Sequence, residues 1–254
     1  MARRTTGTGG RRLWAFDFDG TLAPLVPDRA AARLHPASRS LLKALSAGPG
    51  NLVAVLSSRT LEDLIPRVPF PHLYLGGGSG LEWRMPDGRR IGPAGNTDAK
   101  AMRARRAVLP VMSRISAIPG VELEDKRWSM AIHYRGVPPD ALPALLPLLS
   151  ELSRRPAVRV FRGPGAAEAQ FLRSVDKSFG VRRLCGLAGF DPEGGRIVYA
   201  GDDESDSLAI RWVLSRKGTA FAVGGRIRVA GARPVAGPAA LAREVRALAR
   251  MTPG

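Results

Sequence analysis

Residues 13–22 read Leu13-Trp14-Ala15-Phe16-Asp17-Phe18-Asp19-Gly20-Thr21-Leu22 and indicate how the rest of the chain folds. The first four form an apolar run that is typical of a buried strand, and two acids and a glycine follow closely. In an α/β protein, ligands bind beyond the carboxyl ends of parallel strands. Because charged side chains are seldom placed at the end of an apolar strand without a partner, this stretch predicts a carboxylate nucleophile beside a divalent cation.

Strands and helices alternate on both sides of this stretch. Apolar runs predict further strands at 52–56, 72–75, 196–200 and 219–223. Helices are expected at 38–45, 60–65, 205–214 and 239–251. The alternation is typical of an α/β fold with a Rossmann-like, doubly wound parallel sheet that helices cover on both faces.

The pattern changes after Gly80. Residues 81–171 carry runs of strands beside two helices, which predicts a small α+β unit inserted into the first fold. Met85-Pro86-Asp87-Gly88 is a turn sequence between the first two of these strands. We therefore expect a catalytic core of residues 13–80 and 172–254, an α+β cap of residues 81–171, and a flexible tail at residues 1–12.

The chain is strongly basic. Its formal net charge of +17 over 254 residues favours anionic partners. The arginines are scattered, however, and no aromatic platform is interleaved with them, so we expect no nucleic-acid partner. A positive field also attracts a small phosphorylated molecule. A non-catalytic or nucleic-acid-binding protein on the same fold is the alternative from another functional class.

Compartment and assembly are also suggested by composition. No apolar run is long enough to cross a bilayer, and the start of the chain lacks the apolar middle of a secretory signal. The single cysteine, Cys185, lies in an apolar stretch at 184–187, so we expect it to pack in the core. We expect a cytoplasmic monomer that does not bind a membrane.

Polar clusters follow three of the predicted core strands. They are Asp17-Asp19-Thr21, Ser57-Ser58-Arg59, and Asp202-Asp203 with Asp206 close behind. In a doubly wound sheet these strand ends open on one edge, so the clusters can converge. Lys177 begins the helix just before the last of these strands.

This set of side chains suits phosphoryl transfer. Asp17 could attack phosphorus, and Asp19, on the same face of an extended segment, could act as general acid and base. Asp17 and Asp202 supply hard oxygen ligands for Mg²⁺. Ser57 and Lys177 could hold the phosphate oxygens. Taken singly, the acids of 202–206 could be a helix cap, Ser57 another cap, and Lys177 a solvated surface lysine.

The same residues resemble the four signature motifs of the haloacid dehalogenase superfamily of phosphatases, and more closely the trehalose-6-phosphate phosphatase family. The matching stretches are 16–22, 53–64, 175–177 and 201–206. In the predicted cap, Glu124-Asp125-Lys126, His133-Tyr134-Arg135 and Glu168 resemble that family's sugar-binding residues. The resemblance runs from about residue 13 to residue 251.

The resemblance implies an Mg²⁺-dependent phosphatase that hydrolyses trehalose 6-phosphate through an aspartyl-phosphate. Asp19 would also ligate the metal through its carbonyl, Asp202 would be the second carboxylate ligand, and Asp203 and Asp206 would be ligand or support. Four cap residues would hold sugar hydroxyls: Glu124, Lys126, Arg135 and Glu168. Thr21, Ser58 and Arg59, which belong to the strand-end clusters, are predicted to bind the substrate or its phosphate.

Several readings stay open at this point. Glu124 and Lys126 could instead form a cross-strand ion pair, His133 could be a packed histidine, and His35 and His72 are expected to be structural. Gly78-Ser79-Gly80 stands where the family usually has Glu-His-Gly, and serines at 178, 205 and 207 are further departures. Sucrose 6-phosphate and mannosyl-3-phosphoglycerate are rival substrates, because a fold does not fix its substrate.

Overall fold

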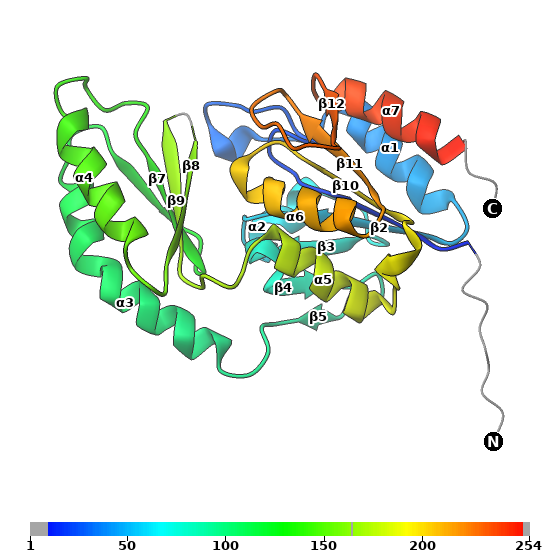
Figure 1. Ribbon diagram of the computed structural model, residues 1–254, viewed down its shortest axis with the longest axis horizontal. Helices are drawn as coiled ribbons and strands as arrows, with labels where there is room; N and C mark the ends of the chain where they lie inside the picture. Colours follow the sequence, from blue (N-terminus) through cyan, green and yellow to red (C-terminus); the bar gives the residue numbers. More distant parts are fainter. Residues whose placement is uncertain (1–9, 164, 251–254) are drawn as a thin grey trace.

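The computed structural model describes residues 10–163 and 165–250, and its largest element is a sheet of eight strands (Figure 1). The strand order is β12-β11-β10-β1-β2-β3-β4-β5. The strands from β12 to β3 are parallel, and β4 and β5 run antiparallel to their neighbours. The strands are β1 (Arg12–Phe16), β2 (Asn51–Leu56), β3 (Tyr74–Gly77), β4 (Glu82–Arg84), β5 (Arg90–Ile91), β10 (Ile197–Gly201), β11 (Thr219–Val223) and β12 (Arg233–Val235).

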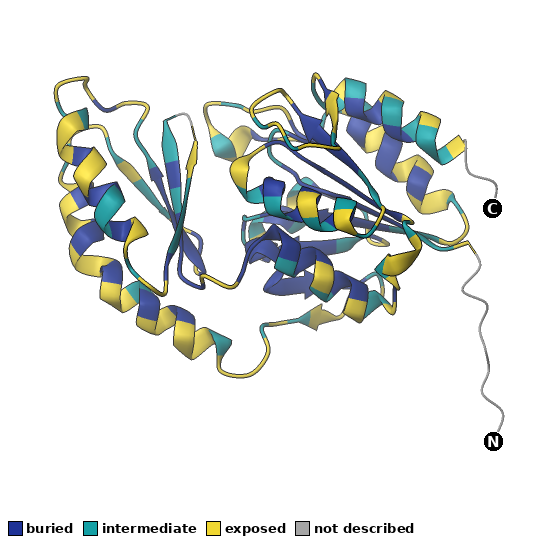
Figure 2. Ribbon diagram, in the orientation of Figure 1, coloured by how far each residue is buried: buried dark blue, intermediate teal, exposed yellow. Residues whose placement is uncertain are grey.

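Helices cover both faces of this sheet. Trp14 and Phe16 of β1 belong to an apolar cluster with α1 and α7, whereas Leu13 and Ala15 belong to a second cluster with α5 and α6. Figure 2 shows the central strands buried over most of their length, as expected for a sheet that is covered on both sides. This arrangement confirms the predicted α/β fold. The helices are α1 (Pro36–Ala47), α2 (Leu61–Leu64), α5 (Lys177–Ala188), α6 (Glu204–Ser215) and α7 (Pro238–Arg250).

The strand register brings the polar clusters to one edge. Phe16, the last residue of β1, lies opposite Ala200 of β10 and Val55 of β2. The three strands therefore end almost level. The residues that follow them, Asp17, Ser57 and Asp202, are placed at the same edge of the sheet, as the strand-end argument predicts.

A second, antiparallel sheet lies beside the first and in the described chain has four strands in the order β6-β7-β9-β8 (Figure 1). Its strands and the helices α3 and α4 share an apolar core that includes Val108, Leu145 and Ile132. Figure 1 shows both helices on the side of this sheet that faces away from the eight-stranded sheet. The elements are α3 (Thr97–Ser116), β6 (Glu122–Asp125), β7 (Ser129–His133), α4 (Leu142–Ser153), β8 (Arg159–Gly163) and β9 (Ala166–Gln170).

The structure differs from the sequence analysis at two boundaries. β4 and β5 were expected in the cap, but β4 pairs with β3, and Trp83 of β4 is fully buried in the core cluster that contains Leu13. Arg12, expected in the tail, pairs with Asn51 as part of β1. Residues 1–9 of that predicted tail lie outside the described residues. The division into a core and a cap as independent domains stays a prediction.

Of the helices within residues 10–163 and 165–250, not one is both long enough and apolar enough to span a membrane.

Candidate active site

The end of β1 carries a buried ion pair. Asp17 follows this strand directly and is 4% exposed, and Lys177, the first residue of α5, is 2% exposed. The Lys177 Nζ atom lies 2.5 Å from Asp17 Oδ1 and 2.9 Å from Asp206 Oδ1. Asp176 fixes the start of α5, because its side chain accepts a hydrogen bond from the Phe179 N–H. The alternative that Lys177 is a solvated surface lysine is therefore wrong.

Burial and charge act against each other on this pair. Burial lowers the pKa of Lys177, but the charges of Asp17 and Asp206 outweigh burial and raise that pKa well above its ordinary value. Burial also raises the pKa of Asp17 well above its ordinary value, Lys177 opposes this change, and Asp206 adds to it. The site thus holds more buried carboxylates than one lysine can compensate, which favours a bound cation.

Three acids at this edge could hold a metal ion. Oxygen atoms of Asp17, Asp202 and Asp206 all lie within 4.8 Å of one another. Asp202 follows β10 and is 2% exposed, and its Oδ2 forms an ion pair with the guanidinium of Arg226. The donor set consists of hard carboxylate oxygens, the kind that Mg²⁺ prefers.

Asp206 and Asp203 have different positions from those expected. Asp206 is fully buried, and its carboxylate accepts hydrogen bonds from Lys177, the Tyr199 hydroxyl at 2.6 Å and the Asp202 N–H at 3.1 Å. Asp203 caps α6, since its Oδ1 accepts the Asp206 N–H at 3.2 Å. The alternative reading of a helix cap therefore holds for Asp203, and Asp206 takes the place in the acidic cluster that was predicted for Asp203.

Asp19 is held by an arginine. Arg59 Nε and Nη2 lie 2.7 and 2.8 Å from the two carboxylate oxygens of Asp19. The remaining nitrogen, Nη1, binds Asp63 at 2.6 Å, and Arg59 is only 3% exposed. Arg59 was predicted to bind substrate or phosphate, but it does not line the pocket described below, and these contacts instead orient Asp19 toward that pocket.

Two hydroxyls are also turned toward protein groups. Thr21 is fully buried, with its Oγ1 3.5 Å from Asp202 Oδ1. Ser57 is 1% exposed, and its Oγ accepts the Arg59 N–H. Neither residue lines the pocket, whereas Ser58 does. The capping role suggested for Ser57 belongs to Thr60, whose side chain accepts the Asp63 N–H.

A cavity of about 840 Å³ lies between the two sheets and connects the acids to the antiparallel sheet. All four predicted sugar-binding residues line it. Lys126 is 3% exposed; its Nζ lies 2.9 Å from Glu168 Oε2 and 3.3 Å from Ser58 Oγ. Arg135 also lines this cavity. Asp17, Asp19 and Lys177 line the opposite end, so one cavity joins the predicted phosphate and sugar sites.

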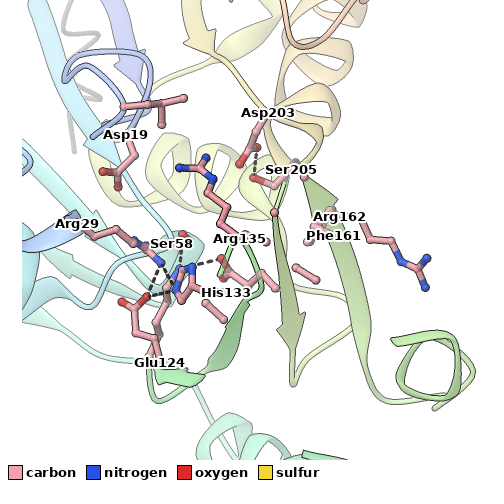
Figure 3. Close-up of a pocket in the computed structure, with 18 of the residues that line it drawn as sticks. Asp19, Arg29, Ser58, Glu124, His133, Arg135, Phe161, Arg162, Asp203 and Ser205 are labelled. Carbon is pink, nitrogen blue, oxygen red and sulfur yellow. Dashed lines mark hydrogen bonds and ion pairs between the residues drawn. The ribbon is translucent and has the colours of Figure 1, made fainter. Parts of the chain in front are cut away.

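The predicted sugar residue Glu124 has partners from both sheets. Its carboxylate pairs with Arg29, a core residue, and its Oε2 lies 3.0 Å from His133 Nε2 (Figure 3). Burial would raise the pKa of Glu124, but the hydrogen bond with His133 and the charges of Lys126 and Arg29 lower it to about 2. The alternative cross-strand pair between Glu124 and Lys126 is not formed, and His133 faces the cavity rather than the apolar core.

The other two histidines and the cysteine lie outside the cavity. His35 caps α1 by accepting the Ala37 N–H at 3.1 Å, and His72 is exposed and does not line the cavity. Cys185 packs in an apolar cluster beside α6, as predicted. Three residues that the sequence analysis did not select, Arg29, Arg226 and Tyr199, contact the predicted site residues. Asp206, which the sequence analysis gave as ligand or support, is the third member of the acidic cluster.

Asp17 and Asp19 after the central strand, Lys177 at the start of α5 and the acids after β10 form one site on a fold that solved haloacid dehalogenase-like hydrolases share. A solved haloacid dehalogenase-like hydrolase from Bacteroides thetaiotaomicron shares this fold at a TM-score of 0.65 and 14% identity, over 94% of this chain and 100% of that chain. The family model described as trehalose-phosphatase matches residues 15–244. The chain belongs to the trehalose-phosphatase family.

Two relatives show how far the similarity extends. A trehalose-phosphate phosphatase from Mycobacterium bovis is 32% identical over 201 residues, which are 76% of this chain and 49% of the relative. The chain thus spans about half the length of the trehalose-phosphate phosphatases that it matches. The solved C-terminal domain of a C. albicans trehalose-6-phosphate phosphatase has a TM-score of 0.79 and 21% identity, over 95% of this chain and 93% of that chain.

Proposed function

We propose that this protein hydrolyses trehalose 6-phosphate to trehalose and phosphate, using Mg²⁺ and an aspartyl-phosphate intermediate. The observation that carries the proposal is the position of Asp17. It is buried against Lys177 and two further acids at one end of a cavity whose other end is lined by Glu124, Lys126 and Glu168. A phosphate bound beside Asp17 would place its sugar among these cap residues.

The residues present fit a divalent cation. Asp17 and Asp202 would hold it, with Asp206 as a ligand or as the support of Asp202 through the Asp202 N–H. Three buried carboxylates with oxygen atoms within 4.8 Å of one another support this assignment. The ion would supply positive charge that offsets the negative charge of the transferring phosphoryl group.

The chain's own residues account for both steps of the reaction. An oxygen of the Asp17 carboxylate attacks phosphorus, the bond from phosphorus to the sugar oxygen breaks, and Asp19 gives its proton to that oxygen. Asp19 then takes a proton from water, the water oxygen attacks the phosphoryl group, and Asp17 is released together with inorganic phosphate. Lys177 stabilises the phosphate oxygens, and Arg59 keeps Asp19 in position.

Sugar recognition is assigned to the antiparallel sheet. Glu124, Glu168 and Lys126 offer carboxylate and ammonium groups that suit hydroxyls, and Arg135 lies in the same cavity wall. Closure of this sheet over the acids would exclude water during the first step. We also expect, as predictions, a cytoplasmic monomer whose partner is a sugar phosphate rather than nucleic acid.

The proposal is tested by phosphate release from a panel of sugar phosphates with and without Mg²⁺. We expect trehalose 6-phosphate to have the highest kcat/KM, ahead of glucose 6-phosphate, sucrose 6-phosphate and mannosyl-3-phosphoglycerate. We also expect Asp17→Asn to abolish turnover while the thermal unfolding curve stays cooperative. A kcat/KM for trehalose 6-phosphate no higher than that for glucose 6-phosphate would contradict the proposed specificity. Turnover by the Asp17→Asn variant would contradict the role of Asp17 as nucleophile.

A further inference from the structure

The core contributes a wall of the cavity opposite the sugar-binding residues of the antiparallel sheet. This wall is the segment Leu25–Arg29, all five residues of which line the cavity. Leu25 is 52% exposed, so a molecule in the cavity can contact its side chain. The segment follows the acidic motif of β1 within a few residues, so it is fixed to the part of the core that carries the proposed chemistry.

The backbone of Arg29 is anchored to the core. Asp28 caps the short 3₁₀-helix Arg29–Ala31, its Oδ1 accepting the Ala30 N–H at 2.8 Å. The carbonyl oxygen of Arg29 accepts a hydrogen bond at 3.0 Å from Nη2 of Arg59, the same nitrogen that binds Asp19. The base of the Arg29 side chain is therefore held in a fixed relation to Asp19.

The guanidinium of Arg29 crosses to the other side of the cavity. It pairs with Glu124 of β6, and its Nη1 lies 3.1 Å from Nε2 of His133 on β7 (Figure 3). The side chains of Arg29 and Glu124 remain 29% and 38% exposed, so a small molecule in the cavity can reach both. A sugar hydroxyl both donates and accepts hydrogen bonds, and it can bind an arginine N–H and a carboxylate at the same time.

We propose that Leu25 and Arg29 form the core half of the sugar-binding site and that Arg29 determines which sugar phosphates are accepted. The inference rests on the proposed function, since it adds a residue to the same sugar site. Arg29 binds a hydroxyl of the sugar that Glu124 also holds, and the exposed side chain of Leu25 contacts the apolar C–H face of a ring. A phosphate ester too short to reach Glu124 gains nothing from Arg29.

Two substitutions test the role of Arg29. Arg29→Gln removes the charge and most donors, whereas Arg29→Lys keeps the charge without the planar fork. Arg33→Gln is the matched control, because Arg33 is exposed, lies four positions further on, and binds the carbonyl oxygens of Ala30 and Ala32. Steady-state kinetics are measured with p-nitrophenyl phosphate and with the sugar phosphate that the unchanged protein hydrolyses best.

We expect Arg29→Gln to raise KM for the sugar phosphate more than it lowers kcat. The ratio of kcat/KM for sugar phosphate to that for p-nitrophenyl phosphate should fall by about tenfold, the scale of one lost hydrogen bond to a charged group. This ratio for Arg29→Lys should lie between the ratios for Arg29→Gln and for the unchanged protein. The ratio for Arg33→Gln should stay within about twofold of that for the unchanged protein. Adding Glu124→Gln to Arg29→Gln should cost less than the sum of the two single losses.

An unchanged ratio in Arg29→Gln, with selective hydrolysis by the unchanged protein, would overturn this inference and leave the proposed function standing. An equal fall in kcat/KM for the sugar phosphate and for p-nitrophenyl phosphate would also overturn the inference, because it would mean that Arg29 only supports the fold or the position of Asp19. Absence of phosphate release from every sugar phosphate by the unchanged protein would overturn the proposed function and the inference together. Thermal unfolding of each variant shows that the comparison is made on folded protein.

Discussion

Gly20 lies so close to Asp202 that a Cβ atom on Gly20 would stand 2.0 Å from Asp202 Oδ2. Gly20 also has a φ of +81°, a backbone conformation that residues with a side chain rarely adopt. The turn after β1 and the turn after β10 therefore approach each other at a point where only glycine fits. This contact brings the first and the last acidic motif of the chain together.

Gly20→Ala is expected to disturb both the fold and the metal site. The positive φ and the overlap with Asp202 together should lower the free energy of unfolding by about 2–4 kcal/mol. Displacement of Asp202 should also weaken Mg²⁺ binding, measured by titration calorimetry. Gly88→Ala is the matched control, since Gly88 has a φ of +86° and no atom within 4 Å of the added Cβ. Equal effects on stability from both variants would show that the approach of Gly20 to Asp202 has no energetic consequence.

Arg59→Lys tests the orientation of Asp19. A lysine keeps the charge but cannot form the two-point contact with the carboxylate, so Asp19 loses its fixed direction. We expect kcat to fall by about a hundredfold, the lower end of the scale of general acid–base catalysis, with a smaller change in KM. Asp63→Asn removes the other carboxylate partner of Arg59 without touching Asp19 and should have the weaker effect. A larger fall in Asp63→Asn than in Arg59→Lys would contradict the assigned role.

Cys185 should be unreactive in the folded protein. Burial raises the pKa of its thiol to about 12, so the thiol stays protonated at neutral pH and the reactive thiolate is scarce. Labelling with a thiol reagent at pH 8 should be slow in native buffer and fast after unfolding in guanidinium chloride. Labelling should accelerate as the pH rises toward 12. Rapid stoichiometric labelling of the native protein at pH 8 would contradict the burial of Cys185.

The sequence was sufficient to predict the parts of the site that follow from local rules. An apolar run with two acids at its end identifies β1 and Asp17, and level strand ends bring Asp17 and Asp202 together. The expectation that β4 belongs to the cap was wrong, because β4 pairs with β3 in the large sheet and a short strand beside a turn carries no information on its partner. Trp83 of β4 packs in the apolar cluster that contains Leu13, and this contact becomes visible only in the folded structure.

Contacts between distant segments could not be predicted. Arg29 and Glu124 are 95 positions apart, and nothing in either local sequence indicates that they meet. Arg59 carries the features of a phosphate-binding arginine, yet its partners Asp19 and Asp63 occupy its guanidinium. The sequence also did not show which of Asp203 and Asp206 caps α6 and which belongs to the acidic cluster. The direction of each side chain determines these roles.

A comparison of Asp206→Asn with Asp203→Asn separates these two acids. Asp206 is fully buried and shares Lys177 with Asp17, so loss of its charge should lower the free energy of unfolding by about 2–4 kcal/mol. Asparagine caps a helix about as well as aspartate, so Asp203→Asn should change stability by less than about 1 kcal/mol. Urea unfolding curves give both values.

The affinity for Mg²⁺ should also fall more in Asp206→Asn than in Asp203→Asn. Asp206 accepts the N–H of Asp202 and belongs to the acidic cluster, so Asp206→Asn should weaken Mg²⁺ binding by about ten- to a hundredfold, as loss of a ligand's support does. Asp203→Asn should have a smaller effect, because its carboxylate is engaged at the start of α6. Calorimetric titration of each variant with Mg²⁺ measures the difference. A stronger loss of Mg²⁺ affinity in Asp203→Asn would return Asp203 to the ligand set and leave Asp206 with a structural role, as the partner of Lys177.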